Sequence, residues 1–277
     1  MLFRSASLPG AATPSDFAPW QAGFDRLGQH AQEAVLKALV NAAITEGLRP
    51  GEDASQRRLA RYDQAIALGT SSPPGAATPS DFVPWQAGFD RLGQDAQAHV
   101  VKALVNAAIT EGRRPGEDAA WRALARFNQA IALCTASPPG AATPSDFAPW
   151  QAGFDKLRPN TQTSVLKALV YAGETEGQRP GEVAARRELA RYDQAIALAT
   201  ASMPVAAEPT DVARWRARFG GLGQDAQATL LTVLVNAGIA EGRLSGESAA
   251  RRALARFDQA IVLCTAVCIQ PPPTAQE

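Results

Sequence analysis

Histidine and cysteine are scarce: the chain has 277 residues but only two histidines and three cysteines. His30 and His99 form no nucleophilic triad pattern with serine, cysteine or aspartate, and the sequence contains no His-rich metal spacing or phosphate-binding glycine loop. We therefore predict that the protein is not an enzyme, and that it has no catalytic, metal-binding or cofactor-binding residue and no small-molecule substrate. This cysteine usage suits a reducing compartment better than a disulfide framework.

Long apolar runs are absent as well. No stretch approaches the roughly 18 consecutive apolar residues that a membrane span requires. The N-terminus lacks the apolar core of a signal peptide, so we expect a cytoplasmic protein, with export without a conventional signal peptide as the alternative. Residues 2–5, Leu-Phe-Arg-Ser, also match the translated end of a sequencing adapter. Residues 1–5 are therefore either an assembly artefact or the natural start.

A surplus of positive charge is missing from the chain and from each of its parts. Lysine plus arginine and aspartate plus glutamate number 27 each. An array that binds nucleic acid would be expected to repeat a cationic surplus in every unit, because phosphate neutralisation supplies much of the affinity. We therefore regard nucleic acid as an unfavoured partner. Arginine far outnumbers lysine and alanine is abundant, a GC-rich codon usage that indicates a bacterial source.

What the chain does have is a period of 65 residues. Tryptophans mark it at Trp20, Trp85, Trp150 and Trp215, and residues 13–77 and 78–142 are identical at 52 of 65 positions. Such a period predicts one supersecondary unit per copy. We divide the chain into an N-terminal segment (1–12), repeat 1 (13–77), repeat 2 (78–142), repeat 3 (143–207), repeat 4 (208–270) and a disordered tail (271–277).

Each repeat is predicted to contain three helices, so the fold class is all-α. In repeat 1 the first helix follows the candidate N-cap Ser15, and the second runs from Gln29 to Glu46, where Gly47 stops it. The third begins after Pro50-Gly51 and frays at residues 70–72. Helical spacing predicts that core positions include the four tryptophans together with Phe17, Phe82 and Phe147.

The arrangement of the repeats has two alternatives. Alanine-rich outer faces would let the second and third helices of neighbours pack closely, which favours a stacked α-solenoid. Alternatively, a 65-residue three-helix unit can bury a small core alone, and the Pro/Ala connectors would then separate independent bundles. One position holds Gly69, Cys134, Ala199 and Cys264 in successive repeats, which indicates a small packed site.

The third helix contains a run that resembles a known repeat family. Residues 60–68, Ala-Arg-Tyr-Asp-Gln-Ala-Ile-Ala-Leu, and their counterparts from Ala125, Ala190 and Ala255 are similar to the second helix of a tetratricopeptide repeat. The resemblance covers about nine residues of each repeat, and that family's period is about 34 residues. It implies helical repeats that present a concave binding surface. We transfer none of the family's peptide-binding residues.

Candidate interaction residues come from positions where otherwise similar repeats differ. In the third helix, position 56 holds Gln56, Trp121, Arg186 and Arg251, and in the preceding loop position 48 holds Leu48, Arg113, Gln178 and Arg243. The opening turns of the second helix vary at 30, 33 and 34, where repeat 2 places His99. Variation on a fixed scaffold either changes the partner or reflects drift of a solvated face. We predict partner-binding roles for Trp121, Arg186, Arg251, His99 and Arg113.

A recurrent arginine also allows two interpretations. Arg61, Arg126, Arg191 and Arg256 each precede a glutamine by three residues on one helix face. They either form a ladder of contacts to an extended partner or pair with a glutamate such as Glu46 at the end of the preceding helix.

Together these features predict a non-enzymatic helical-repeat scaffold that binds another protein and is a candidate bacterial secreted effector. The alternatives are a nucleic-acid-binding repeat array and the repeat region of a larger, truncated enzyme.

Overall fold

The chain is all-α, as predicted. A computed structural model describes residues 14–48, 53–72, 82–135, 147–179, 181–201, 209–244 and 246–267, and within these ranges the regular structure is helical, with no strand. The chain divides into two compact units, Met1–Pro139 and Gly140–Glu277. The connectors between repeats lie outside the described residues, so the predicted repeat boundaries stay predictions.

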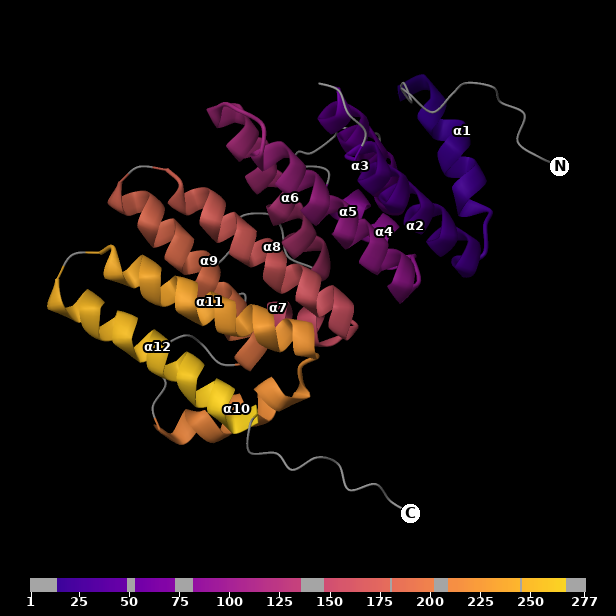
Figure 1. The fold of residues 1–277 in the computed structure, drawn as a ribbon. Helices are drawn as coiled ribbons and strands as arrows, with labels where there is room; N and C mark the ends of the chain where they lie inside the picture. Colours follow the sequence, from indigo (N-terminus) through magenta and orange to yellow (C-terminus); the bar gives the residue numbers. More distant parts are fainter. Residues whose placement is uncertain are drawn as a thin grey trace, which may run out of the picture. The chain divides into compact units, whose positions relative to one another are not determined.

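Three described helices fall within each predicted repeat (Figure 1). The first unit contains α1 (Pro14–Asp25), α2 (Gln29–Glu46), α3 (Ala54–Thr70), α4 (Phe82–Asp90), α5 (Gln94–Gly112) and α6 (Glu117–Thr135). The second unit contains α7 (Phe147–Asp155), α8 (Pro159–Gly177), α9 (Glu182–Thr200), α10 (Pro209–Gly221), α11 (Gln224–Gly242) and α12 (Glu247–Val267).

A repeated glutamine fixes the sharp turn between the first and second helices. Gln32 Nε2 donates to the carbonyl oxygen of Phe24 at 3.2 Å, and the same bond recurs for Gln97, Gln162 and Gln227. It adds a second donor to a carbonyl oxygen near the end of the first helix, which also accepts the backbone N–H three residues later. The predicted bounds of α2 agree with the structure. Ser15, predicted to be an N-cap, instead lies inside α1, which begins at Pro14.

Within each unit the two repeats pack against one another. The second helix of the later repeat contacts both the second and the third helix of the earlier one: α5 packs on α2 and α3, and α11 on α8 and α9 (Figure 1). The predicted small position lies in this contact. A Cβ on Gly69 would collide with Val100 of α5, and Cys134 and Ala199 at the same position are buried.

The tryptophan prediction is correct for three repeats and wrong for Trp20. Trp85, Trp150 and Trp215 are 3–6% exposed, whereas Trp20 is 40% exposed. In the first unit α4 packs against α3 of the preceding repeat as well as against its own α6, whereas the contact recorded for α1 is with its own α3. In the described part of the chain, no helix of an earlier repeat covers α1. Phe17, Phe82 and Phe147, also predicted to be core residues, are half-buried.

Candidate interaction surface

A recurrent ion pair joins the end of the second helix to the start of the third helix. Arg57 Nε donates to Glu46 Oε2 at 3.1 Å, and the pairs Arg122–Glu111 and Arg252–Glu241 repeat this bond at 3.1 and 2.9 Å. The glutamate that was predicted to pair with Arg61 or its counterparts therefore accepts from the arginine one turn earlier on the third helix. The pair fixes the loop between the two helices.

The recurrent arginine represented by Arg61 also connects consecutive repeats, and in repeat 2 it pairs with the preceding glutamate as well, with Arg126 Nη2 3.9 Å from Glu111 Oε1. Arg126 Nη1 lies 2.6 Å from Asp63 Oδ1 of the preceding repeat, and Arg256 Nη2 lies 2.5 Å from Asp193 Oδ1. The side chains of Arg126 and Arg256 are only 18% and 9% exposed. A ladder of contacts to a partner is therefore wrong for these two residues. Burial raises the pKa of Asp193 to about 6, against the lowering effect of the Arg256 guanidinium.

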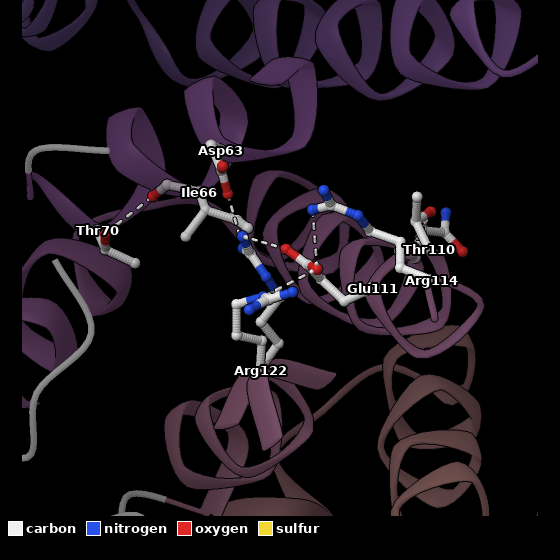
Figure 2. A network of polar contacts seen from close by, with 9 residues as sticks. Asp63, Ile66, Thr70, Thr110, Glu111, Arg114 and Arg122 are labelled. Atoms are coloured by element: carbon white, nitrogen blue, oxygen red, sulfur yellow. Dashed lines mark hydrogen bonds and ion pairs between the residues drawn. The ribbon is translucent and has the colours of Figure 1, made fainter. Parts of the chain in front are cut away.

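Glu111 lies at the centre of this network (Figure 2). Its side chain is 5% exposed, and its carboxylate accepts from Arg122 at 3.1 Å and from Arg114 at 3.4 Å, with Arg126 Nη2 at 3.9 Å. Burying a carboxylate is tolerated when several cations compensate for its lost hydration. The network gives the end of α5 and the start of α6 a fixed geometry.

Two of the predicted partner-binding residues lie on this fixed end. Arg113 is the exposed residue that follows α5, and Trp121 lies in the second turn of α6 with 49% of its surface exposed. The loop between them turns at Gly116, whose φ of +104° favours glycine. Because α5 and α6 are joined by this short loop, the structure brings Arg113 and Trp121 to one end of repeat 2. We call these two residues the loop-end surface.

Arg186 and Arg251 occupy the position of Trp121 in α9 and α12. Both side chains are exposed, at 71% and 76%. Each pairs with a glutamate four residues earlier on its own helix, Arg186 with Glu182 at 2.6 Å and Arg251 with Glu247. Such exposed pairs contribute little to stability, so these guanidinium groups can exchange an intrahelical carboxylate for one on a partner at low cost.

His99 lies apart from the other predicted residues of repeat 2. It is half-buried in the second turn of α5, about 20 Å along the helix from Arg113 at a rise of about 1.5 Å per residue. Burial lowers the pKa of His99, and Glu33 of α2 acts in the opposite direction. His99 therefore lies close to the contact between repeats 1 and 2, not on the loop-end surface.

Variation at the start of the second helix does not mark one exposed face in every repeat. Thr163 and Thr229, at two of the varied positions, are 7% and 8% exposed. Each hydroxyl donates to the backbone carbonyl four residues earlier, that of Pro159 and that of Asp225. The prediction of a varied, partner-facing surface is therefore wrong at these two positions, where the substitutions are packed.

A hollow of about 310 Å³ lies beside the loop between α8 and α9 and includes Gly181, Arg179 and Arg243 in its lining. Both arginines are ion-paired, Arg179 with Glu176 at 3.5 Å and Arg243 with Glu188 at 2.6 Å. The cations are thus already compensated for by buried carboxylates. No group of three or more His, Cys, Asp or Glu side chains suited to a metal ion occurs in the part of the chain that the structure describes.

Sequence reasoning missed the residues that join consecutive repeats. Asp63 and Asp193 accept from the next repeat, and Arg243 reaches Glu188 of the preceding one. Asp63 and Asp193 are equivalent, and an arginine follows each after 63 residues, so the signal was present as a pair of opposite charges one repeat apart. Asn128 replaces this aspartate in repeat 2.

Comparisons with known proteins add no family. No protein-family model matches the chain, and no curated protein matches its sequence. Among the described helices, none combines the length and apolar character that a bilayer crossing requires. The class that the fold defines is an all-α protein whose packed helices recur with the 65-residue period of the sequence.

Proposed function

We propose that the protein is a non-enzymatic helical-repeat scaffold that binds another protein through its loop-end surface, with Trp121 as the anchor. The observation that carries the proposal is the half-exposed indole of Trp121 on a helix end held by the buried Glu111 network. Large aromatic side chains on rigid elements are the most frequent anchors of protein interfaces. Arg113 at the same end of repeat 2 supplies a cation for acidic groups on the partner. Within the second unit, Arg186 and Arg251 present cations at the position that Trp121 has in repeat 2.

The charge balance supports a protein partner over nucleic acid. Formal charge over the chain is zero, and Arg126 and Arg256 of the third helices are engaged by carboxylates of the same chain. We further propose a bacterial protein that acts in the cytoplasm. A secreted effector exported without a conventional signal peptide is the alternative, and fractionation of the expressing cells distinguishes the two locations.

Affinity capture with the immobilised full chain tests the proposal. Three baits are compared by quantitative mass spectrometry of what they retain: the unmodified chain, Trp121→Ala, and Val83→Ala as a matched control at another exposed apolar position, which is 76% exposed. We expect specific proteins on the unmodified and Val83→Ala baits, and at least tenfold less of them on Trp121→Ala. Circular dichroism checks that all three baits are folded.

Two results would contradict the proposal. Equal retention on all three baits would remove Trp121 from any interface. Retention that is lost after nuclease treatment, or that falls steeply with salt in parallel with bound DNA or RNA, would favour the nucleic-acid array instead.

A further inference from the structure

The contact between the two repeats of a unit, which we call the joint, is made by the same types of residue in both units. On the earlier repeat, the third helix supplies an aspartate, and the second and third helices supply apolar side chains. On the later repeat, the second helix supplies small apolar side chains, and the third helix supplies the arginine that meets the aspartate. We call the first surface the receiving face and the second the docking face. Each internal joint buries one of each.

Repeat 4 has a receiving face that the described part of the chain leaves exposed. Val235 and Leu254 are 40% and 63% exposed, although their counterparts in repeat 1, Val40 and Leu59, are 1% and 6% exposed beneath repeat 2. Ile239 beside them is 51% exposed. Asp258, the counterpart of Asp63 and Asp193, is exposed and makes no ion pair with any described residue.

Repeat 1 has the complementary docking face, which is also exposed. Ala31 and Ala38 of α2 are exposed, whereas their counterparts in α5, Ala96 and Ala103, are 2% and 0% exposed against repeat 1. Arg61, the counterpart of Arg126 and Arg256, is half-buried, and its recorded contact is with Gln64 at 3.4 Å on its own helix.

We propose that the chain self-associates head to tail, with repeat 1 of one molecule docked on repeat 4 of the next. The contact reproduces the internal joint: Arg61 pairs with Asp258 as Arg126 pairs with Asp63, and the alanines of α2 cover Val235 and Leu254. Opposite charges at matching positions of the two faces identify a second copy as the occupant. In the second unit, Arg243 of repeat 4 pairs with Glu188 of repeat 3. At the equivalent positions, the new contact places Leu48, which is 81% exposed, over Ala253.

This association is heterologous, because two different surfaces meet. Such contacts extend into open chains unless the rotation between subunits closes a ring. The loop-end surface belongs to repeat 2, whereas the proposed contact uses repeats 1 and 4. Loss of self-association and loss of the proposed partner binding are therefore separate outcomes, tested with separate variants.

Charge reversal on the full-length protein tests the proposal. Sedimentation velocity at increasing concentration is measured for the unmodified chain, for Arg61→Asp and for Asp258→Arg, with Asp118→Arg as a control at an exposed position outside both faces. We expect the average mass of the unmodified chain and of the control to rise with concentration. Each of the other two variants places like charges at the contact and should remain monomeric over at least a tenfold wider range.

Mixing the two variants gives the decisive result. In an equimolar mixture, the aspartate introduced by Arg61→Asp meets the arginine introduced by Asp258→Arg, and the unmodified Arg61 and Asp258 meet in the reverse contact. We therefore expect association to return as alternating copies. An unmodified chain that stays monomeric would overturn the proposal and indicate that another segment covers the receiving face. Association that Leu254→Arg abolishes but Arg61→Asp does not would also overturn it, in favour of a symmetric contact between two receiving faces.

Discussion

Replacing Glu111 with glutamine should destabilise the first unit far more than the same change at the equivalent Glu46. Glu111 is 5% exposed and compensates for Arg122 and Arg114 at 3.1 and 3.4 Å, whereas Glu46, which accepts from Arg57 at 3.1 Å, is 16% exposed. Breaking a fully buried ion pair costs about 3–5 kcal/mol. The side chains of Arg122 and Arg114 retain 49% and 36% exposure, so we expect a loss of about 2–3 kcal/mol for Glu111→Gln.

For Glu46→Gln we expect about 1 kcal/mol, the scale of a single hydrogen bond to a charged group near the surface. Urea unfolding of the full chain, followed by far-UV circular dichroism, measures both. With a denaturant dependence of about 2 kcal/mol per molar urea, the midpoint of the affected transition falls by about 1–1.5 M for Glu111→Gln and by about 0.5 M for Glu46→Gln. Equal shifts would refute the argument that burial of the carboxylate sets the size of the effect.

Three further changes test the packing and the electrostatics of the repeats. Trp85→Ala should lower the free energy of unfolding by about 3–5 kcal/mol, and Trp20→Ala by less than half of that, because only Trp85 is covered by a preceding repeat; similar losses in urea titrations would contradict this. Gly88→Ala should lower the melting temperature, since its Cβ would collide with the carbonyl of the last turn of α3, whereas Gly23→Ala meets no atom and should raise stability by up to about 1 kcal/mol. The pKa of Asp193 is raised from 3.8 to about 6 in the folded state, so its contribution to stability is fully present below about pH 4 and is lost as the pH rises through 6. The unmodified protein should therefore lose about 1–3 kcal/mol more than Asp193→Asn between pH 4 and 7, and parallel pH profiles would show that Asp193 keeps its ordinary pKa.

The helices could be predicted because each repeat carries its own local signals. Gly28 and Gly47 bracket α2 where the sequence places them, and helical spacing puts Leu36 and Val40 in the core. The burial of Trp85 and the exposure of Trp20 could not be read from nearly identical local sequences, because the difference depends on whether a described helix of an earlier repeat packs against the first helix. Local pattern determines the helix, and position in the array determines what the helix buries.

For the candidate site, too, only part of the arrangement could be predicted from the sequence. Trp121 and Arg113 stand out because they differ from their counterparts in repeat 1, and their placement at one end of repeat 2 follows from the short loop between α5 and α6. His99 differs just as clearly, yet it lies far along α5 beside α2, and a difference between repeats gives no information on depth. The arginine at position 126 is the same in all repeats. Its partner Asp63 was missed because it lies in the preceding repeat, 63 residues earlier.

The Asp63–Arg126 joint also bears on how a chain of this kind changes length over generations. Recombination between nearly identical 65-codon copies adds or removes whole repeats, and each new junction then brings together a receiving and a docking face. All four copies carry the arginine, and copies 1, 3 and 4 carry the aspartate. Losing a copy therefore removes one joint without requiring a new contact to evolve, and gaining a copy supplies both halves of the added joint at once. The number of repeats can drift while the two end faces remain the same.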